Sequence, residues 1–310
     1  MKLLSIVIPT YNRKERLFQQ LKSITSQKVS DKVDILICDN CSPYSVDELV
    51  STEFVDAENI EVVSNKYNIG GGANIAMTFL RCRTKWMWLL GDDDETTEDS
   101  IETILEDIEA YPDVAYFKYS IKGFPPYKEK SVESIEDYID YYHFGENYGG
   151  DMIFISNNVY NLDIIGPCFK NTLMQSFFRL PHLMPVFNFL IERQGKVMFR
   201  PKAIVIYQKP EPGTAWNMID VSVGIASLHL GNLKIDKKHY KRLMMKIGSG
   251  FSHRLIVNQC LVLPNRQQAI HLYHYIYKHL IFPKCSFKHI CIYILFHILI
   301  LIRNIIKIKL

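Results

Sequence analysis

Several features are scarce in this chain of 310 residues, and each shortage argues against a class of protein. Seven cysteines are an odd number at irregular spacing, which disfavours a disulfide framework and favours free thiols in a reducing cytoplasm. Cys38 and Cys41 have a metal-like spacing, but no second pair follows, so a structural zinc site is disfavoured. We expect no secretory signal, because the short apolar run at the N-terminus leads into Pro9.

Two common nucleotide-binding motifs are also missing. The glycines at 70–72 lack the G-x-G-x-x-G spacing and follow the third expected strand, so they do not form a dinucleotide fingerprint. There is no G-x-x-x-x-G-K-[ST] loop, which disfavours a P-loop nucleotidase. The segment Asn65–Gly72 can instead approach a ligand closely through its backbone, because glycine adds no side chain.

Acidic residues are absent from one long segment. Residues 237–310 contain 13 Lys and Arg and no Asp or Glu, which leaves 23 basic and all 33 acidic residues in the rest of the chain. An acidic front and a basic tail need different partners. Within the tail, Ile290–Ile302 is apolar except for His297, but it is shorter than the roughly 20 residues that span a bilayer.

This basic and apolar segment favours attachment to an anionic membrane surface. Two alternatives stay open, namely a buried core helix and a tilted span extended through Ile308. Nucleic-acid binding would suit the charge, but the apolar run argues against it. The expected partners of the tail therefore include a membrane surface and no nucleic acid.

Apolar runs alternate with helical stripes along the first 120 residues. The runs predict strands, and the stripes predict helices between them. The expected strands are Leu3–Ile8, Asp34–Cys38, Glu61–Ser64, Trp86–Leu90 and Val114–Tyr119. The expected helices are Arg13–Lys28, a short one at 46–50, Ala73–Arg81 and one along 101–108. This order predicts an α/β fold with a mainly parallel sheet flanked by helices.

Beyond residue 122 the pattern loosens. The acidic stretch Glu129–Asp140 predicts a surface helix, Gly195–Ile206 predicts a pair of strands, and residues 216–281 read as helical. The stretch Gln208–Gly213, with two prolines and a glycine, is the best candidate for a domain boundary.

Polar residues follow three of the expected strands, at Pro9–Asn12, Asp39–Asn40 and Asp92–Asp94. The carboxyl ends of parallel strands share one edge, where open sheets bind ligands. Three adjacent carboxylates repel one another, so a cation such as Mg²⁺ or Mn²⁺ would neutralise them and hold a substrate's phosphates. Alternatively, the aspartates form a solvated loop that caps the next helix. Asp39 either accepts a hydrogen bond from a nucleotide base or forms an Asx turn.

The order and spacing of five motifs resemble the family 2 glycosyltransferases of the GT-A fold over roughly residues 1–120. These motifs are Ser5–Arg13, Leu21–Gln27, Ile37–Ser42, Asn68–Gly70 and Trp88–Asp94. The form Leu89–Asp94 is similar to a bacterial subgroup that adds sugars to O-antigen or capsule repeats, including abequosyltransferase-like enzymes. The resemblance implies a GT-A sheet with a C-terminal helical appendage.

The resemblance also implies residue roles. Pro9, Thr10, Tyr11 and Arg13 would line the nucleotide cleft, with Asn68 and Gly70 beside the nucleotide-sugar. Asp39 would bind the base.

Asp92, Asp93 and Asp94 would be the Asp-x-Asp element, which holds a divalent ion on the diphosphate. Many relatives have Asp where this chain has Gly91, so the register has to be chosen. We assign Asp92 and Asp94 to the metal, and Asp94 also to catalysis.

An inverting transfer further needs a general base for the acceptor hydroxyl. Many family members carry a Glu-Asp pair about a dozen residues before a glycine like Gly195, where this chain has no carboxylate. His182 is the nearest titratable residue, and an imidazole can act as a base at neutral pH. The alternative for His182 is a turn residue or an acceptor contact. Asp151, Asp163 and Glu192 remain other candidates for the base.

These observations together predict a metal-dependent, inverting glycosyltransferase. It would move a sugar from a nucleotide-sugar to a glycan hydroxyl, on an acceptor linked to polyprenyl diphosphate. We expect it at the cytoplasmic face of the bacterial inner membrane. The predicted parts are a GT-A domain over 1–212, a helical extension over 213–283 and a membrane-associating segment over 284–310. The GT-A domain would divide into a nucleotide-binding half (1–120) and an acceptor half (121–212).

Two rival functions stay open. A sugar-nucleotide-forming nucleotidyltransferase would use a similar sheet, but the chain lacks a Gly-rich loop with Arg and Lys near the first strand. A membrane-bound glycan-binding protein with a degenerate site would explain the missing Glu-Asp pair.

Overall fold

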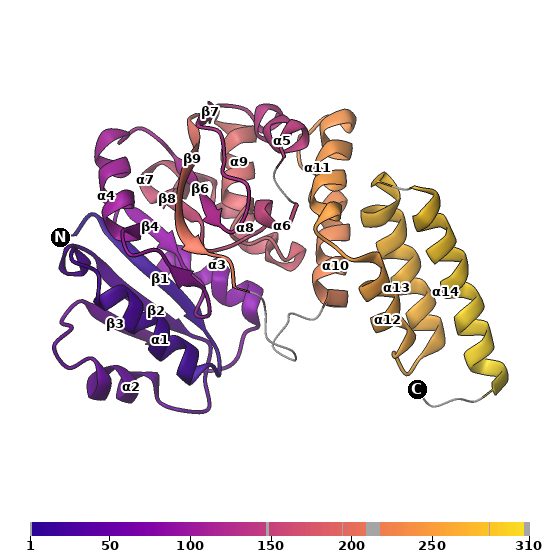
Figure 1. Ribbon diagram of the computed structural model, residues 1–310, viewed down its shortest axis with the longest axis horizontal. Helices are drawn as coiled ribbons and strands as arrows, with labels where there is room; N and C mark the ends of the chain where they lie inside the picture. The colour runs from indigo at the N-terminus through magenta and orange to yellow at the C-terminus, as the bar shows by residue number, and fades with distance from the viewer. Residues whose placement is uncertain (1, 147–148, 194, 209–217, 285, 307–310) are drawn as a thin grey trace. The chain divides into compact units, whose positions relative to one another are not determined.

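The computed structural model describes residues 2–146, 149–193, 195–208, 218–284 and 286–306. The chain divides into two compact units (Figure 1). The first unit consists of Met1–Tyr138 and Phe154–Lys209 and carries the sheet. The second consists of Ile139–Ile153 and Pro210–Leu310 and is helical in its described part.

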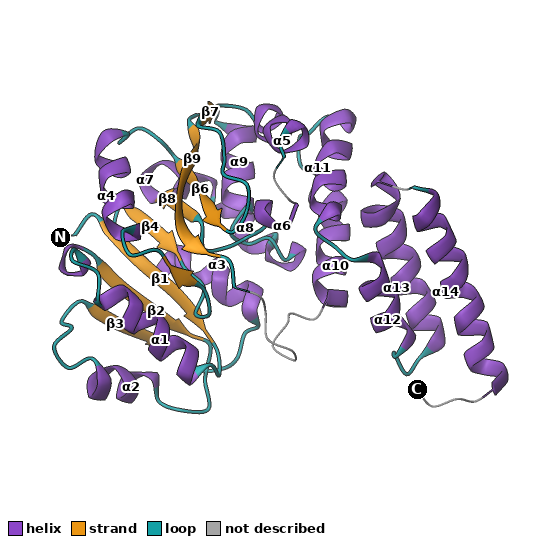
Figure 2. Ribbon diagram, in the orientation of Figure 1, coloured by secondary structure: helices purple, strands orange, loops and turns teal. Residues whose placement is uncertain are grey.

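The first unit is built on a nine-stranded sheet (Figure 2). Its strands are β1 Leu4–Thr10, β2 Asp34–Asp39, β3 Ile60–Ser64, β4 Trp86–Leu89, β5 Glu95–Thr96, β6 Tyr116–Lys122, β7 Lys130–Val132, β8 Asn158–Asn161 and β9 Val197–Ile206. The order is β3-β2-β1-β4-β8-β6-β9-β5, and β7 also pairs with β9. Strands β3, β2, β1 and β4 are parallel, whereas β8 lies antiparallel between β4 and β6.

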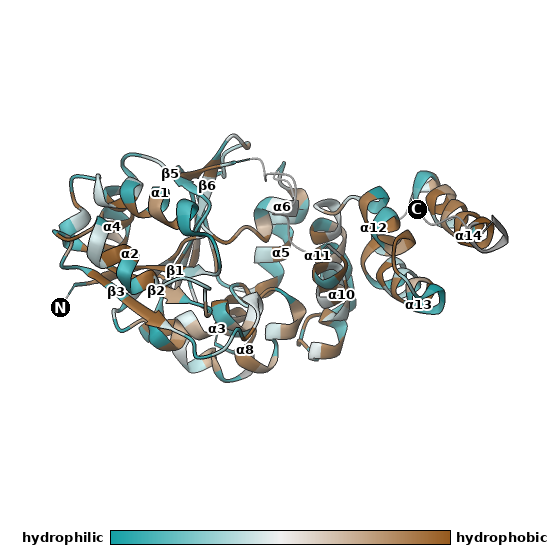
Figure 3. Ribbon diagram, turned by 90° about the horizontal axis from the view of Figure 1, so that it is seen from below, coloured by the Kyte–Doolittle hydropathy of each residue, from teal (hydrophilic) through white to brown (hydrophobic). Residues whose placement is uncertain are grey.

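Helices cover both faces of this sheet, with α1 and α4 on one face and α3 on the other (Figure 3). The helices of this unit are α1 Lys14–Thr25, α2 Val46–Glu53, α3 Gly71–Arg81, α4 Ser100–Ala110, α7 Leu162–Ile165, α8 Lys170–Met174 and α9 Met184–Glu192. Helix α5, Ile135–Phe144, runs across the boundary between the units. The apolar stripes of α1 and α4 pack on alternate residues of β1, β2 and β4, which are buried on both faces.

The expected α/β architecture is confirmed, while two details beyond residue 122 are wrong. The stretch Glu129–Asp140 begins with strand β7, and its helix starts only at Ile135, because the edge of β9 offers β7 a partner. The expected strand pair Gly195–Ile206 is one strand, β9. Its register against β6 shifts between Tyr119 and Ile121, so the strand continues through an irregularity instead of turning back.

The second unit is a group of helices in its described part. They are α6 Gly149–Met152, α10 Met218–Ala226, α11 Lys237–Ser249, α12 His253–Leu261, α13 Arg266–Ile276 and α14 Phe287–Ile306. Asp236, Ser252 and Asn265 cap the first turns of α11, α12 and α13 through their side chains. Within the described residues, no helix is both long enough and apolar enough to cross a membrane. The predicted domain boundary at 212/213 lies outside the described residues.

Candidate functional site

The strand register brings the predicted polar residues to one edge of the sheet. Thr10 pairs with Asp39 at the carboxyl ends of β1 and β2, and the Asn40 amide donates to the Thr10 carbonyl at 2.9 Å. On the other side of β1, the Leu90 amide donates to the Val7 carbonyl at 3.0 Å. The chain therefore leaves β4 toward Asp92 beside the end of β1, as expected for parallel neighbours.

Asp92 is held by the last residue of β1 and by a residue shortly after it. The Thr10 Oγ1 hydroxyl donates to Asp92 Oδ2 at 2.7 Å, and Arg13 Nη1 donates to Asp92 Oδ1 at 3.2 Å. Arg13 also forms an ion pair with Asp93. Asp92 is only 6% exposed, so its charge is compensated inside the protein rather than by bulk water. Four of the predicted site residues thus form one connected group.

Asp94 has a different partner, which the sequence did not indicate. The Ser156 hydroxyl donates to the Asp94 carboxylate and accepts from the Gly91 amide at 2.7 Å. Ser156 is fully buried, and its carbonyl accepts from Trp88 Nε1 at 2.7 Å. Ser156 lies two residues before the polar start of β8, so the pairing of β8 with β4 brings it to the aspartates.

Gly91 occupies a position with no room for a side chain. A Cβ atom there would lie 2.8 Å from Asp94 Oδ2 and 3.2 Å from Ser156 Oγ. These contacts are shorter than ordinary van der Waals distances, so either neighbour would have to move. The glycine therefore permits the hydrogen bond between Ser156 and Asp94.

Burial dominates the protonation of two carboxylates in this cluster. It raises the pKa of Asp92 to about 6, against the opposing effects of the Arg13 charge and the Thr10 hydrogen bond. Burial likewise raises the pKa of Asp94 to about 6, opposed by the Ser156 hydrogen bond. Burial also lowers the pKa of Arg13, but the charges of Asp92 and Asp93 outweigh it and raise the net value. The site is thus anionic at neutral pH and loses charge in mild acid.

Asp39 forms the Asx-type turn that the sequence left as an alternative. The Ser42 amide donates to both Asp39 carboxylate oxygens, at 3.1 and 3.3 Å, and Asp39 is 3% exposed. The turn does not exclude a base contact, because an ionised carboxylate has about four acceptor positions. The Asn12 amide donates to Ser42 Oγ at 2.9 Å, which ties this turn to the end of β1.

A chain of asparagine side chains places Asn68 and Gly70 at the same edge. Asn40 Nδ2 donates to Asn68 Oδ1 at 2.9 Å, and Asn40 Oδ1 accepts from the Ile69 amide at 3.0 Å. Asn68 Oδ1 also accepts from the Gly70 amide at 2.9 Å. Gly70 has a φ of +83°, a left-handed conformation that favours glycine. The sequence named Asn68 and Gly70 but not Asn40 as their support.

Three predicted site residues lie outside this hydrogen-bonded group, namely Tyr11, Pro9 and His182. Tyr11 is 46% exposed, and Pro9 is half-buried at the end of β1. His182 is 2% exposed, and its carbonyl accepts from the Tyr160 hydroxyl at 2.9 Å. Tyr160 pairs with Met87, two residues before the carboxyl end of β4. A base must reach the hydroxyl that it deprotonates, so the role of His182 stays a prediction.

The carboxylates at this edge are also the candidate metal ligands. Among the described residues, no group of three or more His, Cys, Asp and Glu side chains is arranged to hold a metal ion. Magnesium sites at phosphates, however, often use one or two carboxylates, with the phosphates supplying further oxygens. Asp92 and Asp94 offer hard oxygen ligands of this kind, so the donor chemistry fits Mg²⁺ or Mn²⁺.

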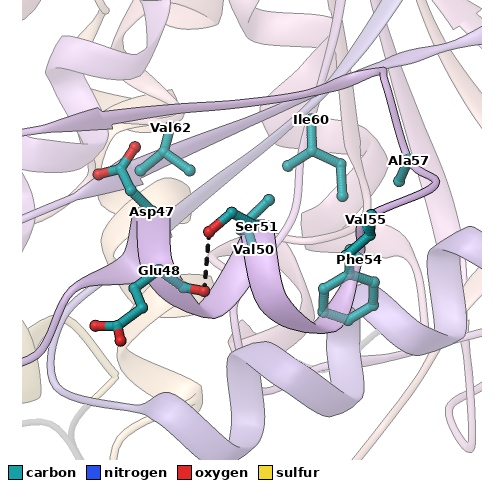
Figure 4. Close-up of a pocket in the computed structure, with 9 residues that line it drawn as sticks. All are labelled: Asp47, Glu48, Val50, Ser51, Phe54, Val55, Ala57, Ile60 and Val62. Atoms are coloured by element: carbon teal, nitrogen blue, oxygen red, sulfur yellow. Dashed lines mark hydrogen bonds between the residues drawn. The ribbon is translucent and has the colours of Figure 1, made fainter.

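A surface hollow of about 460 Å³ lies elsewhere on the first unit (Figure 4). Its lining comes from α2, β3 and the loop between them, including Glu48, Phe54 and Ile60. None of the candidate site residues lines it. The strand-end cluster, not this hollow, therefore carries the argument on function.

Residues 5–166, just over half of the chain, match the family model for Glycosyl transferase family 2. The chain belongs to this family. The matched range contains Thr10, Arg13, Asp39, the three aspartates and Ser156. The family match therefore covers the residues predicted from the sequence and also Ser156, which only the structure revealed.

Two curated relatives match part of the chain. Over 115 residues it is 30% identical to abequosyltransferase RfbV of Salmonella typhimurium, covering 36% of this chain and 34% of that protein. Over 120 residues it is 29% identical to an uncharacterized glycosyltransferase of Haemophilus influenzae, covering 39% of each. The chain thus spans less than two fifths of the length of these relatives.

Solved structures of similar fold cover nearly the whole chain. One is TarS 1–349 of S. aureus in complex with UDP-GlcNAc, with a TM-score of 0.58, 14% identity and coverage of 92% of this chain and 89% of that one. Another is the mannosyltransferase PcManGT of Pyrobaculum calidifontis with GDP-Man and Mn²⁺, with a TM-score of 0.53, 11% identity and coverage of 99% and 88%. These likenesses confirm the expected GT-A-like fold.

Proposed function

We propose that this family 2 chain is a glycosyltransferase that moves a sugar from a nucleotide-sugar donor to a glycan hydroxyl. The observation that carries the proposal is the convergence of Thr10, Arg13, Asp39 and Asp92–Asp94 on one sheet edge. Two structural relatives hold UDP-GlcNAc and GDP-Man, which supports a nucleotide-sugar as the class of donor.

Each part of the edge suits one part of such a donor. Asp39 would accept a hydrogen bond from the base, while Asn68 and Gly70 close the loop beside it. Asp92 and Asp94 would hold Mg²⁺ or Mn²⁺ at the diphosphate, and Arg13 and Ser156 orient these two carboxylates. A bound divalent ion would neutralise the charge that develops on the departing nucleoside diphosphate.

The acceptor side of the proposal draws on the sequence and on one relative. We propose that the transfer inverts the anomeric carbon and that His182 deprotonates the attacking hydroxyl. We propose as the acceptor an O-antigen or capsule repeat on polyprenyl diphosphate. The similarity of Leu89–Asp94 to a bacterial subgroup that adds sugars to O-antigen or capsule repeats supports this acceptor class, and the partial match to an abequosyltransferase agrees with that subgroup. The basic and apolar tail supports work at the cytoplasmic face of the inner membrane, where a lipid-linked acceptor would be available.

A panel of nucleotide-sugars tests the donor site. Calorimetry with the whole chain is expected to show Mn²⁺-dependent binding of one donor, weakened about tenfold or more by Asp94→Asn because a charged ligand is lost. Asp113→Asn is the matched control, since Asp113 is an exposed carboxylate that forms an ion pair with Lys196 at 2.8 Å and lies outside the candidate site. Full transfer in excess EDTA would contradict metal dependence.

Turnover on lipid-linked acceptors tests the proposed acceptor and the role of His182 as the base. Loss of turnover in His182→Ala, with donor affinity unchanged, is the expected result for a base. If turnover stays near that of the unmodified chain, His182 is not the base. Donor binding without turnover on any such acceptor favours the glycan-binding alternative, whereas formation of a sugar-nucleotide favours the nucleotidyltransferase.

A further inference from the structure

Helix α14 buries one of its sides and exposes the other. Phe296 is fully buried and Ile300 is 2% exposed, and the Phe296 ring lies 3.9 Å from that of Tyr273 on α13, centroid to centroid. On the other side, eight large hydrophobic residues of α14 are exposed, from Phe287 at 81% to Leu299 at 36%. We call six of these the outer face of α14: Ile290, Ile294, Leu295, Ile298, Leu301 and Ile302.

The outer face is unusual for a surface helix. A helix on a water-exposed surface normally carries polar residues on its outer side, whereas one that is apolar all round is normally covered. Lys288 is the only charged exposed residue of α14 among those whose side chains the structure describes. Figure 3 shows the ribbon of α14 in the hydrophobic colour along most of its length. Contact with a partner would remove this apolar surface from water.

Charge selects the partner. The segment 237–310, which forms α11 to α14, has 13 basic and no acidic residues. Lys237, Lys241, Lys278 and Lys288 are exposed on it. Two copies of such a segment would repel each other, whereas an anionic lipid surface attracts it by about 1 kcal/mol for each basic residue near the headgroups.

Apolar surface also continues from α14 onto α11. Phe287 and Ile290 line a hollow of about 640 Å³ together with Met244 and Phe282. Lys241 belongs to the same hollow. An apolar wall next to a lysine matches the chemistry of a lipid, which has an acyl chain below an anionic headgroup.

We infer that the second unit binds an anionic lipid surface with α14 lying in the plane of the membrane interface. The outer face of α14 inserts among the acyl chains, and the exposed lysines contact the headgroups. The helix lies flat because its other side is buried against the unit's own helices, where α12 and α13 pack. This inference gives the proposed membrane partner a surface, a charge preference and an orientation, and it holds independently of sugar transfer.

Co-sedimentation of the full chain with vesicles tests the inference. Binding is expected to phosphatidylglycerol vesicles, to be much weaker to phosphatidylcholine vesicles, and to fall as salt shortens the Debye length from about 10 Å at 0.1 M to 3 Å at 1 M. Ile294→Glu/Ile298→Glu places two carboxylates on the outer face and should lower the bound fraction about tenfold or more. Both sites are exposed, so the fold should tolerate the change, and circular dichroism checks this.

A matched variant controls for the added charge. Val55→Glu/Leu80→Glu also replaces two exposed hydrophobic residues by glutamate, but in the first unit, and should leave vesicle binding nearly unchanged. Equal binding by both double variants would overturn the role of α14. A dimer in sedimentation analysis that Ile294→Glu/Ile298→Glu dissociates, without vesicle binding, would identify a second copy as the partner instead.

The two proposals fail separately. Donor binding is measured on the same samples without vesicles. If the unmodified chain binds a donor but no vesicles, the membrane inference alone is overturned, whereas vesicle binding by a chain that binds no donor overturns the transferase proposal alone.

Discussion

Three consecutive aspartates are divided between two partners in this protein. Arg13 pairs with Asp92 and Asp93, whereas Asp94 accepts a hydrogen bond from Ser156, two residues before strand β8. The Arg13 charge offsets the repulsion between Asp92 and Asp93, while a hydrogen bond stabilises Asp94. Gly91 makes this division possible, because its amide binds Ser156 Oγ and no side chain crowds Asp94.

The substitution Gly91→Ala tests this residue-scale argument. The added Cβ would meet Asp94 Oδ2 at 2.8 Å, so we expect a loss of about 1–3 kcal/mol in stability and a clear loss of Mn²⁺-dependent donor binding. Thermal unfolding and calorimetry measure the two effects. Gly166→Ala is the control, since a Cβ at Gly166 has nothing within 4 Å. Equal behaviour of the two variants would show that Gly91 does not shape the site.

At the scale of elements, the short strand β8 completes the site. Its segment Asn158–Asn161 is polar at both ends, so it does not read as a strand in the sequence. Its antiparallel pairing with β4 and β6 nevertheless buries all four residues and delivers Ser156 beside Gly91. The geometry of the candidate site thus depends on an element from the weakly patterned region beyond residue 122.

The loop at 65–70 is a second element whose position depends on distant residues. Asn40, at the end of β2, bonds both to Asn68 and to the Ile69 amide, and Asn65 bonds to Asn40 Oδ1 at 2.9 Å. Removing one such partly buried side chain leaves several polar groups without their present partner. The asparagines therefore act together to hold the loop beside Asp39.

We expect Asn40→Ala to raise the KM for the nucleotide-sugar about tenfold with little change in kcat, because the loop is released while the aspartates stay in place. Steady-state kinetics measures this split. Asn59→Ala is the matched control, because Asn59 makes two hydrogen bonds to the Ser30 and Val33 carbonyls before β3 begins. It should lower stability to a similar degree without a specific change in KM. A fall in kcat alone for Asn40→Ala would contradict a role in donor binding.

At the scale of the whole molecule, the two units carry titratable groups with opposite shifts. In the first unit, burial raises the pKa of Asp92 and Asp94 to about 6, above the usual 3.8. In the second unit, burial lowers the pKa of His143 and His279 below the usual 6.5, and the stacked neighbour His229 lowers that of His279 further.

The signs of these shifts predict opposite pH dependence. Carboxylates with a raised pKa contribute stability below pH 3.8 that is lost as the pH rises through 6. Histidines with a lowered pKa contribute stability above pH 6.5 that is lost as the pH falls through their folded pKa. When the pH falls from 7.5 to 5.5, the first unit should therefore become more stable and the second unit less stable.

Scanning calorimetry at the two pH values tests this prediction, with the two unfolding transitions moving in opposite directions. Asp94→Asn should raise the unfolding temperature of the first unit at pH 7.5 and have less effect at pH 5.5. His279→Gln should reduce the acid sensitivity of the second unit, whereas His271→Gln, at an exposed position of α13, is the control. Parallel shifts of both transitions in the unmodified chain would rule out the assignment.

The residues at the ends of the first strands follow from local sequence patterns. Apolar runs followed by Thr10, Asp39 and Asp92–Asp94 are local patterns, and parallel strands in chain order put their carboxyl ends at one edge. The composition of the tail likewise shows that the segment of α14 is apolar and has no acidic residues.

How those residues are held, and which surfaces stay exposed, depends on contacts between distant parts of the chain. Ser156 lies 65 residues from Gly91, and Asn68 lies 28 residues from Asn40, so their hydrogen bonds cannot be predicted from local sequence patterns. The side of α14 that is exposed likewise depends on where Tyr273 and its neighbours pack, not on the nearly uniform hydrophobicity of the helix. Local patterns specify elements and their ends, whereas long-range contacts set the geometry of the site.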